Sequence, residues 1–72
     1  MEIAGSAHRH GVTDEDIRHV LDNAIRYHDL DDGVMIVGPG TNGDLIEVGV
    51  ATEPAVAEPR VVHAMPARPK FL

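Results

Sequence analysis

The stretch TDEDIRHVLDNAIRYHDLDDGVMIV, residues 13–37, contains the change of pattern that decides the fold class. In its first half, apolar residues recur at i, i+3, i+4 and i+7 from Ile17 to Ala24, which predicts an amphipathic helix of about three turns. Thr13 suits the N-cap of this helix, and three acidic residues follow it in the first turn, where the helix dipole favours negative charge. After Ala24 the period changes, and the rest of the stretch predicts strands.

Strands joined by short turns are expected over the second half of the chain. Residues 25–30 partly alternate, and the sequence DDG at 31–33 is typical of a tight turn before the apolar run 34–37. Turn residues and prolines then predict a turn over 38–44, a strand over 45–51, a loop over 53–59 and a last strand over 60–65.

The strand over 45–51 has two different faces. Ile46, Val48 and Val50 share one of them, and Glu47 and Gly49 share the other, because successive side chains alternate across a strand.

The N-terminal segment completes the predicted fold. Residues 6–10 are expected to form a short opening helix that ends at Gly11, in the left-handed conformation that glycine tolerates best. Short connections favour antiparallel neighbours, so we predict an α+β fold in which two N-terminal helices pack on one face of a four-stranded antiparallel meander sheet.

Length and composition indicate a single small domain over residues 1–72. A chain of this size buries only ~60% of the surface that its unfolded form exposes, so its stability is marginal and is often borrowed from a partner, which includes a second copy of the chain. Cysteine is absent, which excludes disulfides and thiolate chemistry. No signal peptide and no stretch of ~20 apolar residues is visible, so we expect a cytoplasmic protein that does not enter the membrane.

The charge is distributed unevenly along the chain. The net charge is −6, yet the last thirteen residues, RVVHAMPARPKFL, hold three bases and no acid. A negative protein repels nucleic acid at long range. Salt screening limits the electrostatic field of the basic end to a range of roughly 10 Å, so this end would act as a local patch for phosphate or for an acidic partner surface.

Three motifs suggest ligand sites, and for each we favour a structural interpretation. His8 and His10 resemble a metal pair, but residues two apart on a helix point in different directions. The acids within residues 29–32 lack the calcium-loop pattern, and the glycines within 38–43 lack the Lys-Ser/Thr pair of a phosphate loop. We therefore expect a helix end and two turns there, with neither a metal nor a cofactor.

The C-terminal group has chemistry of its own. His63 lies mid-strand on the same alternate set as Val61 and Met65, and Arg68 and Lys70 follow on a proline-stiffened tail. An imidazole moves protons near neutral pH, and fixed cations stabilise the charge that grows on the oxygens of a reacting phosphate. These groups suit RNA cleavage without a metal. The alternative is a hydrogen-bonded strand histidine followed by a solvated tail.

Residues 9–17, RHGVTDEDI, with VLDN at 20–23, resemble the opening of BrnT-like toxins, KHGV-S-xE-x-A/V, and the related opening RGI-S-x-x-D-V of DUF4258-type small domains. Both families continue into a strand, a hairpin with a glycine (here Gly43), an apolar strand, and a final strand with an alanine (here Ala64) before a basic tail. The final strand of BrnT-like chains reads I-S/T-A-R/Y, so their catalytic residues do not transfer one for one.

The resemblance implies a RelE-like ribonuclease fold and a toxin that is neutralised by an antitoxin encoded beside it, itself expected to bind DNA. RNA is the expected substrate. RelE-like enzymes keep bases near the C-terminus, which selects Arg68 and Lys70, and the chemistry above adds His63. His10 and Tyr27 are secondary catalytic candidates. Two alternatives remain open: a non-catalytic module of the same fold that oligomerises or binds another protein, and a metal-dependent enzyme.

Overall fold

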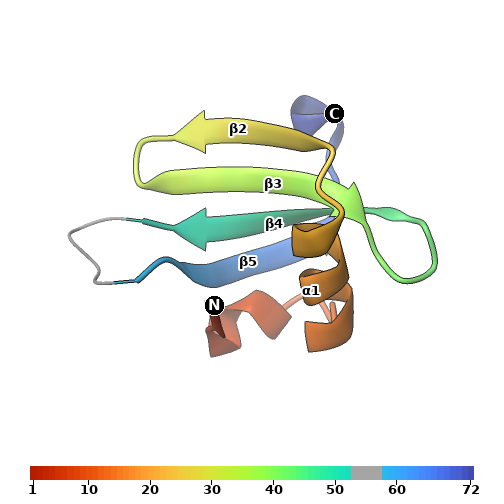
Figure 1. Ribbon diagram of the computed structural model, residues 1–72, viewed down its shortest axis with the longest axis horizontal. Coiled ribbons are helices and arrows are strands. Elements are labelled where there is room, and N and C mark those ends of the chain that lie inside the picture. The colour runs from red at the N-terminus through yellow and green to blue at the C-terminus, as the bar shows by residue number, and fades with distance from the viewer. Residues whose placement is uncertain (53–57) are drawn as a thin grey trace.

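The computed structural model describes residues 1–52 and 58–72, so most of the predicted 53–59 loop lies outside the described residues. The chain forms one α-helix and a five-stranded mixed sheet of strand order β1-β5-β4-β3-β2 (Figure 1). The elements are β1 (Glu2–Ile3), the 3-10 turn η1 (Gly5–His8), α1 (Asp14–Asp22), β2 (Arg26–Leu30), β3 (Gly33–Pro39), β4 (Leu45–Ala51), β5 (Arg60–Pro66) and the 3-10 turn η2 (Pro69–Phe71).

The predicted α+β class is confirmed, and the four predicted strands form an antiparallel meander. The prediction of a four-stranded antiparallel sheet is wrong, because a fifth strand, β1, pairs parallel to β5 and makes the sheet mixed. Strands β2, β3, β4 and β5 pair antiparallel in chain order, with two-residue and five-residue turns between the first three. Strand β4 has the predicted bounds. The register between β4 and β5 shifts by one residue between Gly49 and Val50, which is a β-bulge of the kind that bends and twists a sheet.

The helix α1 forms for the reasons that its sequence indicates. The Thr13 hydroxyl accepts a hydrogen bond from the Asp16 backbone N–H at 3.2 Å, so the predicted N-cap is present. Ile17 and Val20 are completely buried against the sheet. The helix ends at Asp22 and is capped by Asn23, whose backbone N–H and side-chain amide both donate to the His19 carbonyl.

The prediction of two N-terminal helices is wrong. The opening segment is a four-residue 3-10 turn, η1, and it follows a short strand, β1, that pairs parallel to β5. Four residues that include Gly5 and Ser6 are too few to nucleate an α-helix, whereas a 3-10 turn needs no more. Ser6 donates to the Val62 carbonyl at 2.8 Å and fixes the turn on β5. The predicted left-handed glycine is present, because Gly11 has φ 81°.

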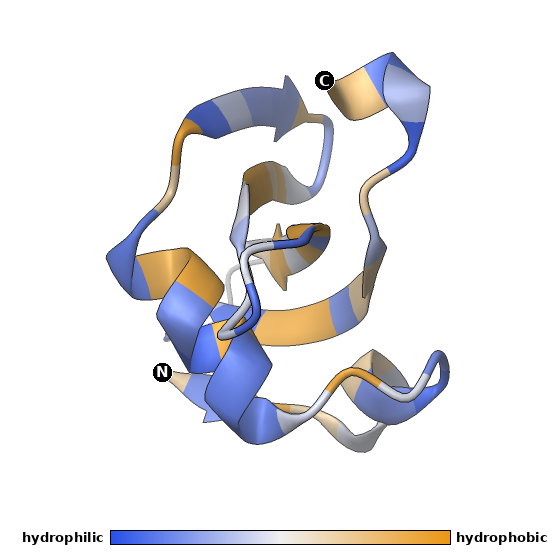
Figure 2. Ribbon diagram, turned by 90° about the vertical axis from the view of Figure 1, so that its right-hand side faces the viewer, coloured by the Kyte–Doolittle hydropathy of each residue, from blue (hydrophilic) through white to orange (hydrophobic). Residues whose placement is uncertain are grey.

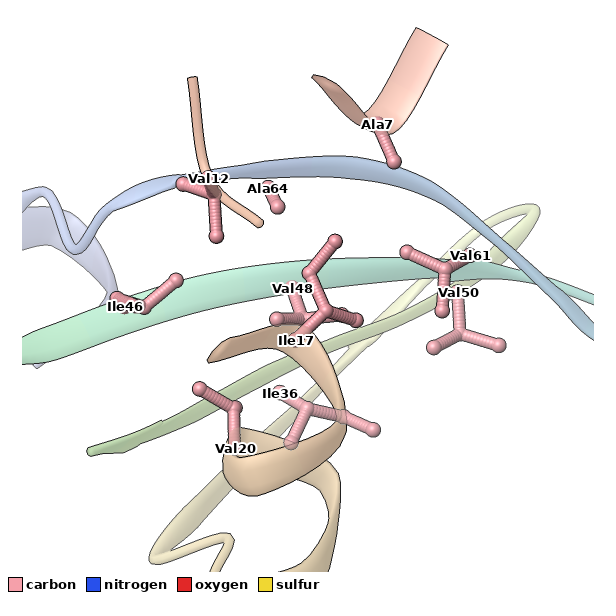
Figure 3. Close-up of a cluster of buried hydrophobic side chains, with 10 residues drawn as sticks. All are labelled: Ala7, Val12, Ile17, Val20, Ile36, Ile46, Val48, Val50, Val61 and Ala64. Carbon is pink, nitrogen blue, oxygen red and sulfur yellow. The ribbon is translucent and has the colours of Figure 1, made fainter. Parts of the chain in front are cut away.

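The main core lies between α1 and the sheet face that α1 covers (Figure 3). Its buried members come from η1, the segment between η1 and α1, α1 itself and the three strands β3, β4 and β5: Ala7, Val12, Ile17, Val20, Ile36, Ile46, Val48, Val50, Val61 and Ala64. The opposite face of the sheet carries the C-terminal segment, which Figure 2 places on the side away from α1. No helix among the described residues is long and apolar enough to span a membrane.

Candidate functional site

The site is built around Glu47, the one charged side chain that is completely buried among the described residues. It lies in the middle of β4 between two core residues, Ile46 and Val48. Because side chains alternate along a strand, Glu47 points to the face away from α1. A carboxylate taken out of water costs several kcal/mol unless charged groups or hydrogen bonds replace the water, so its partners determine whether the chain can fold this way.

Arg68 is the principal partner of Glu47. Its Nε lies 3.1 Å from Oε1, its Nη2 lies 2.7 Å from Oε2, and its backbone N–H donates to Oε1 at 2.9 Å. The side-chain contacts form a bidentate, charge-assisted pair, which is the strongest geometry for an arginine and a carboxylate. Residues 67–68 are drawn onto the sheet by this pair, together with the hydrogen bond from the Ala67 N–H to the Leu45 carbonyl.

His63 is the second partner of Glu47. Its Nε2 lies 2.8 Å from Oε2, and its side chain is 29% exposed. An ionised carboxylate can only accept, so Nε2 carries the proton in this contact and Nδ1 is left as the acceptor nitrogen of a neutral ring. Gly49, which pairs with His63 across the sheet, makes room for the imidazole, since a Cβ at Gly49 would stand 3.1 Å from the His63 Cβ.

The protonation of Glu47 follows from these partners. Burial alone would raise the pKa of Glu47, but the hydrogen bonds from Arg68 and His63 and the charge of Arg68 outweigh burial and lower it to about 2. The same carboxylate raises the pKa of Arg68. At neutral pH the cluster therefore holds a buried carboxylate, a permanently charged guanidinium and an imidazole whose second nitrogen is not bound to Glu47.

The C-terminal tail has a second anchor. The ring nitrogen Nε2 of His28, on β2, lies 2.7 Å from the Phe71 carbonyl oxygen, and the two rings are 5.5 Å apart. The cationic groups of Arg68 and Lys70 lie 5.4 and 5.2 Å from the centre of the Phe71 ring. The tail thus brings two cations onto the face that holds His63, both close to the Phe71 ring.

His10, in the segment after η1, contacts the same cluster. Its ring centroid is 5.9 Å from that of His63, in an edge-to-face arrangement. His10 also lines a pocket of about 380 Å³ at the end of the sheet, together with residues of α1, of the 40–44 turn and of the strand ends. The Asp16 carboxylate, which lines this pocket, accepts from the backbone and hydroxyl of Thr41 at 2.9 and 2.7 Å.

Four of the five sequence-predicted site residues therefore gather in one region: His63, Arg68, Lys70 and His10. Tyr27 does not join them. It lies in β2 opposite Ile36, a residue of the α1-facing core, so its side chain points to the other face of the sheet. Tyr27 is 64% exposed there.

Three motifs that could have been ligand sites, namely the histidines at 8 and 10, the acids within 29–32 and the glycines within 38–43, lie at a helix end and at turns. His8 is bonded to Asp14 and His10 contacts His63, so the two histidines face different partners. No three His, Asp or Glu side chains among residues 1–52 and 58–72 are grouped as metal ligands. The 31–32 acids form the turn between β2 and β3, and the glycine-rich 40–44 segment is the turn between β3 and β4.

Glu47 was missed by sequence reasoning, although a signal for it existed. It is the only charge within the apolar strand 45–51, flanked by Ile46 and Val48. A lone acid in such a run requires a buried partner, and the bases available downstream were few.

Comparison with known protein families, with curated proteins and with solved structures finds no match to this chain.

Proposed function

We propose that this chain is the toxin of a type II toxin–antitoxin system, with a RelE-like fold, and that it is an endoribonuclease that cleaves RNA without a metal. The observation that carries the proposal is the convergence of His63 and Arg68 on the buried Glu47 carboxylate. The order of elements also supports it, since a helix, an antiparallel meander and a basic tail are what the resemblance to BrnT-like toxins implies.

His63 is the proposed general base. Glu47 holds its Nε2–H at 2.8 Å, which fixes the tautomer and the ring orientation and leaves Nδ1 to accept a proton. The nearby negative charge also stabilises the imidazolium that forms when the base is protonated, as a carboxylate behind a catalytic histidine does. An RNA 2′-hydroxyl placed against Nδ1 would lose its proton to that nitrogen.

Arg68 and Lys70 are the proposed phosphate ligands. Arg68 uses Nε and Nη2 on Glu47, and Nη1 makes no hydrogen bond to the residues that the structure describes. Its side chain is 41% exposed, so a phosphate can reach it. Cations held in place before the reaction stabilise the charge that develops on the phosphorane oxygens.

His10 is the proposed general acid, because its ring is 5.9 Å from that of His63. In the reaction the 2′-oxygen attacks the adjacent phosphorus and the bond from phosphorus to the 5′-oxygen breaks. One proton passes from the 2′-hydroxyl to His63, and another passes from protonated His10 to the leaving 5′-oxygen. The products are a 2′,3′-cyclic phosphate and a 5′-hydroxyl end.

The partner that this function requires is an antitoxin, encoded beside the toxin and able to bind DNA. In a chain with a net charge of −6, the basic tail is a local region attractive to phosphate or to an acidic segment. An antitoxin that covers the tail would therefore neutralise the toxin by occupying the cations that RNA needs.

The test is induced expression in a bacterial host, with growth and total RNA integrity followed together, and cleavage of a labelled RNA by the purified protein. The informative variants are His63→Gln and Lys70→Ala. The glutamine amide that replaces the imidazole can still donate to Glu47 but cannot take up a proton, and Lys70 makes no contact with Glu47. Both variants should fold, and His63→Gln should lose about 10²-fold or more of the cleavage rate.

The matched control is Arg60→Ala, which removes a base from the opposite end of β5. It should keep the activity, whereas Lys70→Ala should lower it. Arg68→Ala is a poor probe, because it removes the main partner of Glu47 and destabilises the fold as well as the site. A folded wild-type protein that neither arrests growth nor cuts RNA would contradict the proposal.

The second candidate is a non-catalytic module of the same fold that binds protein. The observation that favours it is that Glu47 is completely satisfied by Arg68 and His63, since a purely structural anchor for the tail would use the same contacts. Under this alternative, His63→Gln and wild-type chains behave alike in both assays, and the protein binds its partner without cutting RNA.

A further inference from the structure

Strand β2 is an edge of the sheet, and the C-terminal turn η2 contacts its tail-side face through the bond between His28 and the Phe71 carbonyl. The strand pairs with β3 on one side and has no strand neighbour on the other within residues 1–52 and 58–72. Figure 1 shows it at the margin of the sheet, beside β3. An edge of five residues presents unpaired backbone N–H and C=O groups, which is a template for pairing with another strand.

The same edge also exposes apolar side chains. Three of the six large hydrophobic residues that are exposed in the described chain lie at Ile25, Tyr27 and Leu30, with exposed fractions of 63%, 64% and 41%. Ile25 and Tyr27 stand on the sheet face that carries α1, but the helix packs mainly on β3 and β4, and both side chains are exposed. The exposed apolar side chains and the unpaired backbone groups together make β2 available for pairing with another strand.

The opposite edge of the sheet is protected. The two-residue strand β1 pairs with the start of β5, and η1 packs beside it through the bond from Ser6 to the Val62 carbonyl. Short edge strands and covering loops are the usual devices against edge pairing. Strand β2, with five residues and no strand beside it among the described residues, lacks the first of these devices.

The charges along β2 specify which strand can pair with it. Arg26 stands at its beginning, whereas Asp29, Asp31 and Asp32 stand at its end and in the turn that follows. Arg26 is exposed and forms no salt bridge with any residue that the structure describes. A strand that is positive at one end and negative at the other is complementary to a reversed copy of itself.

We infer that β2 is the homodimer interface of this protein, and that two copies pair their β2 strands antiparallel to make one continuous sheet. Pairing centred on His28 sets Arg26 of one copy opposite Leu30 of the other, next to the turn that carries Asp31 and Asp32 of the other copy. It also brings the two Tyr27 side chains within diagonal reach on the α1 side. The inference does not depend on RNA cleavage.

The interface is of modest size. One five-residue edge with a few side chains buries less than the ~1,600 Å² of a standard stable complex, so the dimer should dissociate on dilution. Sedimentation equilibrium of the full chain, from low micromolar to submillimolar concentration in buffered salt, should show a monomer–dimer equilibrium. A monomer throughout that range overturns the inference.

Charge reversal tests the register. Arg26→Glu places like charges near Asp32 of the second copy and should raise the dissociation constant about tenfold or more. The matched control is Arg18→Glu, an exposed site on α1 that makes the same change in net charge and should leave the dissociation constant unchanged. Equal dimerisation by the two variants overturns the assignment to β2.

A mixing experiment separates this interface from any other. Arg26→Glu and Asp32→Arg should each be monomeric alone, but their mixture restores both Arg–acid contacts and should form a one-to-one heterodimer. No association in the mixture overturns the proposed pairing. Circular dichroism checks that both chains fold. If Asp32→Arg disturbs the turn, a second variant, Tyr27→Asp, tests the same interface. It places an acid opposite Asp29 of the second copy and must abolish dimerisation.

Discussion

The sheet face that α1 covers and the face that the C-terminal segment covers are held by different forces. Toward α1, branched aliphatic side chains such as Ile17, Val20 and Val48 exclude water completely, and no charge is buried among them. Toward the tail, the contact centres on Glu47 and its bonds to Arg68 and His63. The α1 face is stabilised by burial of apolar area. The tail face, where Met35 and Val37 are also buried, depends in addition on the satisfaction of one carboxylate.

This difference separates what makes the chain fold from what could make it act. Apolar packing is tolerant, because hydrophobic residues of similar volume can replace one another at modest cost. A buried ion pair is intolerant, because loss of either partner leaves the other charged and out of water. The candidate catalytic groups lie on the face that holds the buried ion pair, so many substitutions there will change stability and activity together.

The largest expected effect is on the face that α1 covers. Ile17→Ala should lower the free energy of unfolding by about 3 kcal/mol, because it removes buried methyl groups and leaves a cavity. Urea denaturation followed by circular dichroism at pH 7 measures it. Leu72→Ala, at a half-exposed terminal side chain, is the control and should change stability by less than about 0.5 kcal/mol. Equal stability of the two variants would contradict the position of the core.

On the tail side, Arg68→Met should cost nearly as much, about 3 kcal/mol, because Glu47 keeps its charge in a buried position with only His63 beside it. Lys70→Met is the matched control: it removes the same charge from the same tail without touching Glu47, and should cost under about 1 kcal/mol. If the two variants were equally stable, the Glu47 pair would not be what holds the tail.

The two faces should respond differently to acid. Glu47 has a folded-state pKa of about 2 against an ordinary value of 4.5, so its contribution is complete above pH 4.5 and is lost as the pH falls toward 2. Denaturation measured between pH 7 and pH 2 should show this loss in the wild type. The loss should be smaller in Glu47→Gln, whereas Ile17→Ala should shift the whole curve without changing its slope. Parallel curves for wild type and Glu47→Gln would disprove the shifted pKa.

The smallest effect concerns a carboxylate that is not buried as Glu47 is. Asp16 accepts two hydrogen bonds from Thr41, and these bonds lower its pKa. Because water can replace them, Asp16→Ala should cost only about 1 kcal/mol, with Glu15→Ala as the control for helix position. Thermal unfolding compares the two. A cost as large as that of Arg68→Met would mean that burial does not explain the difference between the faces.

Local patterns in the sequence were enough to predict most of the elements. The apolar spacing and the Thr13 cap predicted α1, and alternation with turn residues predicted four strands and their order, because these signals act between residues close in the chain. The parallel strand β1 could not be predicted, since two residues carry no period. The opening helix failed for a similar reason: one turn has too little local preference to form an α-helix.

The candidate site could be predicted only in part. The sequence by itself determined that His63, Arg68 and Lys70 belong to one basic segment, and that Glu47 lies on the strand face away from Ile46 and Val48. Only the tertiary structure decided that Glu47 meets His63 and Arg68, which stand 16 and 21 residues further along the chain. That meeting depends on the register between β4 and β5, its bulge, and the return of the tail over the sheet. Composition and spacing do not encode such a contact, because it is a property of the paired strands as a whole.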